Sequence, residues 1–354
     1  MAAFLDLALY HPEFGYYARA AQRSGRGGDF FTSVDVGPLF GELLAAQVAE
    51  MFDLLSEPPA PALVEAGAGN GRLSADILRA ARHDPSFYDR IRLHLVEASA
   101  AARDAQRATL GGAAERLVSS SAAIPEAFEG VLIANELLDA MPVHQLVMRE
   151  DGLREIYVTA SRDASGLLTT TEGPLSTPAL RDHLDALGAR LEPGWRVEVS
   201  LQAVDWVRRA ARALGRGFLI LIDYGHEARE LYSVTHSSGT LTAYSGHKSL
   251  GPESAGTPWL ERPGEQDLTA HVDFTSIRRA AEAEGLTTLG FLDQTYFLMG
   301  LLSSLPNPQS AIRNPQWKTL IMPGGLGSAL KVLILCKGVG APTLRGLSFK
   351  VRAT

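Results

Sequence analysis

Short apolar runs alternate with amphipathic stretches along most of the chain after residue 61, which is the pattern of strands followed by helices. Seven runs have the length and composition of strands, at residues 62–64, 92–97, 117–118, 130–134, 217–225, 287–291 and 331–336. Strands that alternate with helices form parallel sheets with right-handed crossovers. We therefore expect an α/β fold with a mostly parallel seven-stranded sheet and helices on both faces.

Three segments precede or interrupt this alternation. Residues 1–57 come before the first strand and include an amphipathic helix predicted over 40–55, so we assign them to an N-terminal helical cap or lid. Residues 58–354 form the main domain, with an insertion at about 145–190 whose alternating pattern predicts hairpin strands. A second insertion, at 226–268, has little periodicity, which is typical of a functional or disordered loop.

The first strand runs into a glycine-rich turn. Glu65 ends the strand, and Gly67, Gly69 and Gly71 follow at alternate positions before an apolar-periodic helix. Glycine lets the backbone turn sharply and lets a ligand approach, while the helix N-terminus offers N–H groups to an anion. Dinucleotide-binding turns have the spacing G-x-G-x-x-G. The acid-x-G-x-G-x-G spacing found here is typical of methyltransferases that use S-adenosylmethionine (AdoMet), with Glu65 attracting the AdoMet ammonium.

Other residues extend this predicted cofactor site. Glu97 ends the second strand, where a carboxylate can accept both ribose hydroxyls. Ser120 follows the third strand and is a candidate adenine contact. The glycine-rich loop at 24–33 carries Gly28, Asp29 and Thr32 and has the composition of a lid over a cofactor. The alternatives are a tight turn that binds nothing, a solvated Glu97 and a plain surface loop.

The fourth strand ends in an amide and two carboxylates, Asn135, Glu136 and Asp139. The carboxyl ends of parallel strands face the ligand crevice, so these side chains should lie beside the transferred group. Carboxylates there can hold a cationic nitrogen in line and take its proton. The alternative is a helix cap at Asn135 with solvated acids.

Composition and charge narrow the function class. The net charge is −7 and the pI is near 5.8, which argues against a general nucleic-acid or anionic-membrane binder. The single cysteine, Cys336, allows no internal disulfide and no cysteine zinc cluster, so we expect no metal site and a reducing compartment. We see neither a membrane-spanning run of 18 apolar residues nor a signal peptide.

Several motifs occur in an order that resembles the MidA family of AdoMet-dependent methyltransferases. They are GYY at 15–17, GDFFTS at 28–33, EAGAGNG at 65–71, NELLDAMPV at 135–143, DYG at 223–225 and GEQDLTAHVDF at 264–274. The resemblance implies a Rossmann-like class I methyltransferase domain. It also implies AdoMet bound by the turn 65–71 and Glu97, and a GDFFTS loop that covers it. On the acceptor side it places Asn135, Glu136 and Asp139, with Asp267 and His271 as further candidates. His271 has a structural alternative, as a cap or a core histidine.

The resemblance also implies a substrate class. Mitochondrial members are known as respiratory complex I assembly factors that dimethylate an arginine of a complex I subunit. We therefore expect methyl transfer to a protein arginine guanidinium, in a bacterial cytoplasm or, in a eukaryote, the mitochondrial matrix. Two alternatives stay open: N- or O-methylation of a small molecule, and a non-catalytic assembly factor that keeps the fold. A homodimer is compatible with the sequence, which identifies neither the acceptor nor the oligomeric state.

Overall fold

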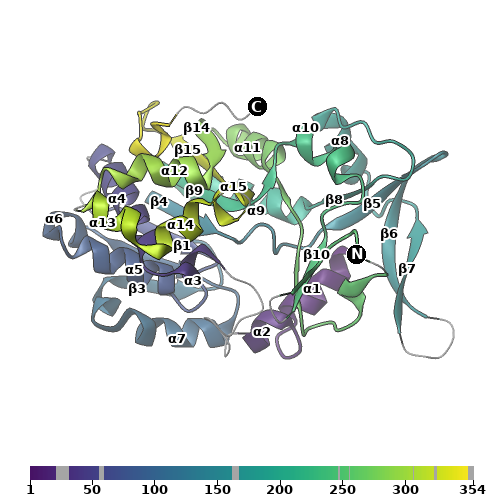
Figure 1. The fold of residues 1–354 in the computed structure, drawn as a ribbon, viewed down its shortest axis with the longest axis horizontal. Coiled ribbons are helices and arrows are strands. Elements are labelled where there is room, and N and C mark those ends of the chain that lie inside the picture. The colour runs from purple at the N-terminus through teal and green to yellow at the C-terminus, as the bar shows by residue number, and fades with distance from the viewer. Residues whose placement is uncertain are drawn as a thin grey trace.

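The computed structural model of the chain describes residues 1–20, 32–55, 60–161, 167–245, 248–254, 256–305, 307–322 and 325–349. Its centre is a sheet with the strand order β14-β15-β9-β4-β1-β2-β3 (Figure 1). These strands are β1 (Ala62–Ala66), β2 (Arg92–Val96), β3 (Leu117–Ser121), β4 (Phe128–Asn135), β9 (Leu214–His226), β14 (Thr287–Asp293) and β15 (Leu330–Lys337). A two-residue strand, β13 (Val272–Asp273), also pairs with the end of β9.

Strand directions confirm the predicted mostly parallel sheet. The strands from β9 through β4, β1 and β2 to β3 run parallel, whereas β15 is antiparallel to both β9 and β14. Glycine lets three of these strands approach closely. A Cβ at Gly130 of β4 would lie 2.0 Å from the carbonyl oxygen of Ala62 in β1, and one at Gly217 of β9 would lie 1.8 Å from that of Gly130. Because these five strands are parallel, their carboxyl ends all lie at one edge of the sheet.

Helices cover both faces of the sheet. One face packs against α4 (Leu39–Leu54), α5 (Arg72–Ala81), α12 (Gln294–Leu302) and α14 (Pro315–Ile321), with α7 (Ala100–Leu110) beside α5. The other face packs against α9 (Leu201–Ala213) and α11 (Phe274–Ala283). Phe40, Leu43 and Val48 of α4 are fully buried in the first of these layers. Helix α4, which the sequence assigned to the N-terminal cap, thus packs into the central core. Shorter helices complete the layers: α3 (Ser33–Val36), α6 (Pro85–Tyr88), α13 (Pro308–Arg313) and α15 (Leu326–Ala329).

Two small antiparallel sheets lie to one side of the central sheet (Figure 1). The first has the order β7-β6-β5-β8, from β5 (His144–Arg149), β6 (Gly152–Ala160), β7 (Leu168–Gly173) and β8 (Arg196–Val199), and it confirms the predicted hairpin strands. The second contains β10 (Thr242–Ser245), β11 (Lys248–Leu250) and β12 (Asp267–Thr269). The described residues of the segment 226–268 therefore form short strands and turns, where the sequence pattern indicated a long irregular loop.

The N-terminal helices pack against these small sheets. Helix α1 (Ala2–Tyr10) buries Leu5 and Leu9 in a cluster with Val147 of β5 and Leu241 beside β10, and α2 (Tyr16–Ala20) follows it. Apolar burial of this kind fixes the first helix to the insertions. Among the helices of the described residues, none combines the length and apolar character needed to cross a membrane.

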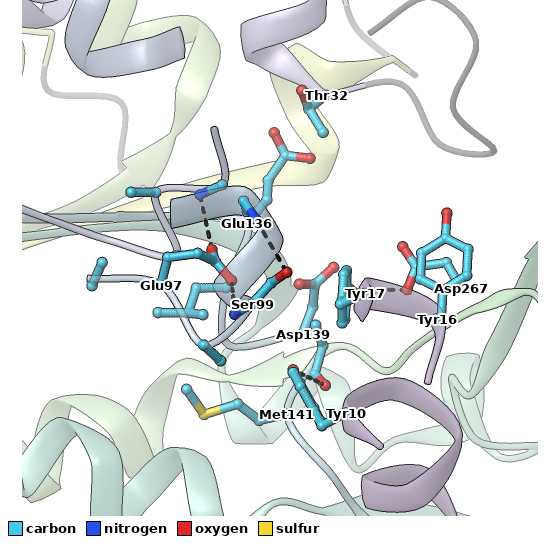
Figure 2. Close-up of a pocket in the computed structure, with 18 of the residues that line it drawn as sticks. Tyr10, Tyr16, Tyr17, Thr32, Glu97, Ser99, Glu136, Asp139, Met141 and Asp267 are labelled. Carbon is cyan, nitrogen blue, oxygen red and sulfur yellow. Dashed lines mark hydrogen bonds between the residues drawn. The ribbon is translucent and has the colours of Figure 1, made fainter. Parts of the chain in front are cut away.

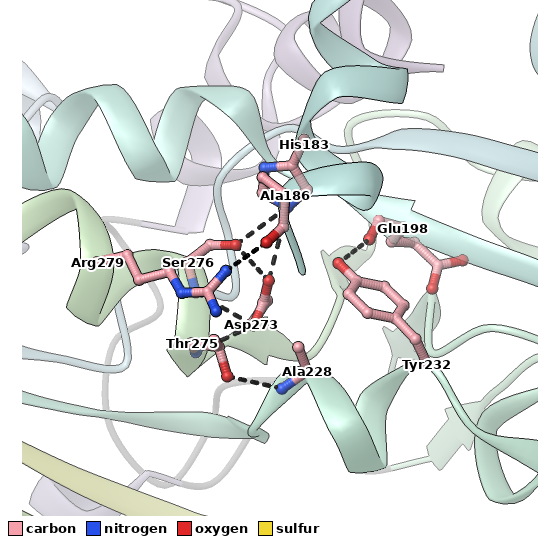
Figure 3. Close-up of polar contacts among 9 residues, drawn as sticks. All are labelled: His183, Ala186, Glu198, Ala228, Tyr232, Asp273, Thr275, Ser276 and Arg279. Carbon is pink, nitrogen blue, oxygen red and sulfur yellow. Dashed lines mark hydrogen bonds and ion pairs between the residues drawn. The ribbon is translucent and has the colours of Figure 1, made fainter. Parts of the chain in front are cut away.

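The insertion helices are attached to α11 by polar contacts (Figure 3). The Arg279 guanidinium donates to the carbonyl oxygen of Ala186 at the end of α8 (Ala179–Leu187), at 2.6 Å. The Ala228 N–H, at the start of α10 (Ala228–Leu231), donates to the Thr275 hydroxyl at 2.9 Å. The first contact holds α8 beside α11, and the second holds the chain after β9 against the N-terminus of α11.

Candidate active site

The glycine turn between β1 and α5 has a left-handed backbone at all three glycines. The φ angles are +72° at Gly67, +51° at Gly69 and +86° at Gly71, a region that favours glycine. The turn is held to the end of β2, because the N–H groups of Gly67 and Ala68 both donate to the carbonyl oxygen of Val96, at 2.9 and 3.1 Å. The glycine turn predicted from the sequence is thus present, and two backbone hydrogen bonds fix it to the end of β2.

The two acids predicted for the cofactor have different surroundings. Both oxygens of Glu97 accept backbone N–H groups, from Gly69 at 2.8 Å and from Ser99 at 2.8 Å, so the carboxylate is fixed at the rim of the turn. Glu65 is buried and accepts both the N–H and the hydroxyl of Ser74 on α5. Burial raises the pKa of Glu65 to about 7, against the lowering effect of Ser74. Glu65 thus anchors α5 to β1 as well as lining the cavity described below.

The turn after β4 is positioned by Asp223 at the end of β9. One oxygen of Asp223 accepts the N–H groups of Leu137 and Leu138, at 3.0 and 2.7 Å, and the other accepts the N–H of Tyr224 at 2.8 Å. Glu136 takes a left-handed φ of +50° in this turn, a conformation that is costly for a residue with a Cβ. A strained residue held by several hydrogen bonds is typical of a functional site.

A cavity of about 930 Å³ joins the two turns. Glycine-turn residues 65–70 line one side of it, and Asn135, Glu136 and Asp139 line another. Figure 2 shows Glu97, Glu136 and Asp139 around this space, with Tyr10, Tyr17 and Asp267 on the side of the N-terminal helices. The predicted cofactor turn and the predicted acceptor acids therefore face one common cavity.

The surroundings of the acids in the turn after β4 disfavour their charged forms. Burial raises the pKa of Glu136 to about 8, and the Ser33 N–H, which donates to its Oε1 at 2.9 Å, only partly opposes this. Burial and the neighbouring carboxyls of Asp223 and Glu136 raise the pKa of Asp139 well above its ordinary value. Within the described residues, neither Glu136 nor Asp139 forms an ion pair, and Oε2 of Glu136 is buried without a hydrogen-bond partner. A cation entering the cavity would relieve this accumulation of acids.

Aromatic residues from the first two helices close the cavity opposite the glycine turn. The Tyr17 hydroxyl donates to Asp267 at 2.9 Å, and the Tyr10 hydroxyl donates to the carbonyl oxygen of Ala140 at 2.9 Å. Burial raises the pKa of both phenols above the ordinary value, so both remain neutral hydrogen-bond donors. The N-terminal segment thus contributes directly to the walls of the cavity.

The structure places the remaining predicted residues in three ways. Thr32 lines the cavity and caps α3, where its hydroxyl accepts the Asp35 N–H at 3.2 Å. Gly28 and Asp29 lie outside the described residues. Ser120 is not brought to the cavity, because β3 extends to Ser121 and the Ser120 hydroxyl donates to Gln106 of α7 at 2.6 Å.

His271 also lies away from the cavity. Its imidazole packs against His226 and His236, with ring centroids 5.3 and 5.8 Å away. Burial lowers the pKa of His271 to about 3, so the ring is neutral. This arrangement does not place a proton acceptor beside Glu136, and His271 is left out of the site proposed below.

Several lining residues were not singled out from the sequence. Tyr10, Met141 and Trp206 line the cavity, and Asp223 shapes it from behind. Tyr17 and Asp223 lie within motifs that carried the family resemblance, which was the available signal. Tyr10 and Trp206 lie in ordinary amphipathic helices, where nothing in the local pattern separates a cavity residue from a core residue.

The fold and the cavity together define a Rossmann-like class I methyltransferase domain that uses AdoMet. Residues 43–292 match the profile of a family described as S-adenosyl-L-methionine-dependent methyltransferases, and the chain belongs to this family. The enzyme class and the cofactor expected from the sequence are thereby confirmed.

Named relatives and a solved structure agree with this membership. The chain is similar to the protein arginine methyltransferase NDUFAF7, mitochondrial, of Mus musculus, at 30% identity over 85% of this chain and 70% of the relative. It is similar to the NDUFAF7 homolog of Drosophila melanogaster at 27% identity over 97% of this chain and 83% of that one. A crystal structure from Burkholderia thailandensis, bound to S-adenosyl-homocysteine, matches with a TM-score of 0.86 and 30% identity, and covers 99% of this chain and 91% of that chain.

The residues present fit AdoMet. Gly69 lines the cavity, and a Cβ added there would meet no protein atom within 4 Å, so the space above the turn is open to a ligand. We propose that the turn 67–71 receives the carboxylate end and that Glu97 accepts the ribose hydroxyls, with Glu65 facing the ammonium. The bound cofactor supplies a methyl group activated by its sulfonium. With the cofactor placed in this way, Glu136 and Asp139 would line the part of the cavity left for an acceptor.

Proposed function

We propose that this methyltransferase acts on a guanidinium nitrogen of a protein arginine. The observation that carries the proposal is a pair of carboxyls, the buried Asp139 and the partly buried Glu136, which share a cavity with the glycine turn and have no cationic partner within the described residues. The names of the curated relatives, protein arginine methyltransferases, support the same acceptor.

The chemistry required by such an acceptor suits these two acids. A guanidinium has a pKa above about 12, so it enters as a cation and must lose a proton as its nitrogen is methylated. Glu136, with its pKa raised to about 8, is a stronger base than an ordinary carboxylate. Binding the cation next to Glu136 and Asp139 would lower the pKa of both groups and favour carboxylates that hold the guanidinium, one of which accepts its proton. Tyr17 and Asp267 would orient the rest of the acceptor side chain.

The curated relatives suggest a compartment and a kind of partner. Because they are named mitochondrial proteins, we propose the mitochondrial matrix for a eukaryotic source and the cytoplasm for a bacterial one. The family resemblance adds a respiratory-complex subunit as a candidate substrate. Neither assignment alters the chemistry of the site.

The test is identification of the labelled product. The purified chain is incubated with methyl-labelled AdoMet and host lysate, and the labelled molecule is identified by mass spectrometry, with the Gly67→Val variant as the inactive control. We expect methylated arginine in a protein, and loss of label when that arginine is replaced by lysine. Label on a small molecule, on a hydroxyl, or on nothing at all would contradict the proposal.

A further inference from the structure

Three histidines outside the cavity gather at the end of β9. His226 ends β9, His236 lies in the short 3-10 turn η2 (Val234–His236), and His271 precedes β13. One ring nitrogen from each lies within 4.8 Å of the others. Since ligand nitrogens on a tetrahedral zinc ion are about 3.3 Å apart for bonds of about 2.0–2.1 Å, small side-chain rotations would bring all three onto one ion.

The backbone beneath these rings is fixed. Strand β13 pairs in parallel with β9, so that Val272 faces Gly225 and Asp273 faces His226. The Thr275 hydroxyl, near Asp273 in Figure 3, accepts the N–H of Ala228 two residues after His226. The η2 turn is tied to β8, because the Arg196 N–H donates to the carbonyl oxygen of Ser237 at 2.8 Å. Three separate segments thus present their imidazoles from anchored positions.

Acceptor groups of Glu230 lie near Nδ1 of two of the rings. Nδ1 of His236 lies 3.1 Å from the carbonyl oxygen of Glu230, and Nδ1 of His226 lies 3.1 Å from the carboxylate of the same residue. A carbonyl or carboxylate on one ring nitrogen fixes the tautomer and leaves the other nitrogen as a lone-pair donor. At His226 the Glu230 carboxylate lies close to Nδ1 without forming a hydrogen bond, so only the His236 ring is oriented in this way.

His271 supplies an independent observation. Its Nδ1 is buried and has no hydrogen-bond partner within the described residues. A buried polar nitrogen without a partner destabilises the fold unless a bound ion, water or ligand pairs with it. Lys331 contributes positive charge near this ring, but its ammonium is paired with Asp293 at 2.5 Å and donates to the Ser328 carbonyl oxygen at 2.9 Å. The carboxylate of Glu230 adds a negative charge beside His226 to favour a cation.

We propose that His226, His236 and His271 bind one divalent transition-metal ion of the zinc type, with water in the fourth position. This departs from the expectation of no metal, which rested on cysteine alone. The ion would join the insertion to the carboxyl end of β9, three residues after Asp223. It would also fix the segment in which the Ala270 N–H donates to the Asp139 carbonyl oxygen at 3.0 Å.

The test uses the full chain, free of any histidine tag and stripped with a chelator, titrated with Zn²⁺ by calorimetry and with Co²⁺ by visible absorption. We expect one equivalent to bind with a Kd in the micromolar range or below, with the intense visible bands of low-coordinate Co²⁺ and a rise in Tm. His236→Ala, in a partly exposed turn, and His226→Gln should weaken binding at least tenfold and remove the bands. The control His83→Ala, at an exposed site before α6, should bind like the wild type.

Circular dichroism of the metal-free variants separates loss of the site from loss of the fold. A folded His236→Ala variant that binds Zn²⁺ as tightly as the wild type would overturn the proposal. A wild-type chain that shows no Co²⁺ bands and no Zn²⁺-dependent rise in Tm would overturn it too, and would assign the three rings to packing alone. Neither outcome bears on methyl transfer to arginine, which is measured separately.

Discussion

The Leu138 N–H donates to the carboxylate of Asp223 at 2.7 Å. This bond connects the end of β9 to the turn that carries Glu136 and Asp139, and the same oxygen also accepts the Leu137 N–H at 3.0 Å. Asp223 is therefore a positioning residue, because it holds the backbone of the acceptor turn while its own side chain stays behind the cavity wall.

Asp223→Asn should disturb this turn without touching the cofactor. The asparagine side chain has one acceptor oxygen and one NH₂ group. The NH₂ group would therefore face either the Leu137 and Leu138 N–H groups or the Tyr224 N–H, and those N–H groups would lose their acceptor. We expect a loss of about 1–3 kcal/mol in the free energy of unfolding, measured with urea. Methyl transfer should fall at least tenfold while the AdoMet Kd changes less than threefold. The exposed change Asp205→Asn is the control, and equal behaviour of the two variants would refute the positioning role.

Gly67→Val should abolish AdoMet binding. The backbone at Gly67 has φ +72°, and a Cβ there would lie 3.0 Å from a methyl carbon of Leu137, so valine would strain and displace the wall between the two turns. Gly188→Val is a matched control, since Gly188 has φ +67° at the end of α8 and open space around it. Calorimetry should show AdoMet binding lost in the first variant and kept in the second. Binding retained in a folded Gly67→Val protein would remove the turn from the cofactor site.

The raised pKa of Glu136 predicts a pH-dependent stability. Its pKa is about 8 in the folded chain and near 4.5 when exposed, so between these values the unfolded state releases a proton that the folded state keeps. Stability should therefore fall as pH rises from about 4.5 to 8. Glu136→Gln removes this penalty, and we expect it to gain roughly 1–3 kcal/mol at pH 8.5, discounted for solvent in the cavity. Thermal melts of the cofactor-free proteins at pH 5 and 8.5 measure the difference. An equal gain at both pH values would contradict ionisation as its source.

Tyr17→Phe should weaken binding of the methyl acceptor and leave binding of AdoMet unchanged. The change removes the hydroxyl that donates to Asp267 at 2.9 Å and leaves the buried ring in place. We expect kcat/KM for the acceptor to fall about 3- to 30-fold, the range of one charge-assisted hydrogen bond, with an unchanged AdoMet Kd. Tyr157→Phe, in β6 and away from the cavity, is the control. Equal kinetics in the two variants would exclude Tyr17 from acceptor binding.

The central sheet and the glycine turn could be predicted because their signals are local. Each strand is a short apolar run, and the turn is a fixed spacing of Glu65, Gly67, Gly69 and Gly71 directly after one of them. The acids of the turn after β4 were found for the same reason, since they follow an apolar strand immediately. Parallel strands bring such ends together, so local patterns sufficed to place both halves of the cavity on one edge.

The remaining features depend on contacts between distant residues. Ser120 lies within β3, which continues for three residues beyond the predicted strand at 117–118, and its hydroxyl donates to Gln106. The strand pattern in the sequence does not define this boundary. His271 was considered beside the acceptor, but its neighbours are His226 and His236, which are 45 and 35 positions earlier in the chain. The local sequence pattern cannot predict contacts between residues so far apart in the chain.

The rate of methyl transfer by Glu136→Gln, measured together with its AdoMet affinity, tests the central claim most directly. Glutamine keeps the shape of the side chain and removes the charge that holds and deprotonates a guanidinium. The account predicts turnover lower by about 10²–10⁴-fold, the scale of a positioned general base, with an AdoMet Kd within about threefold of wild type. Glu129→Gln, at the exposed opposite end of β4, should transfer methyl normally. A Glu136→Gln enzyme that binds AdoMet and methylates its substrate at near wild-type rate would contradict the carboxylate mechanism and the cationic acceptor with it.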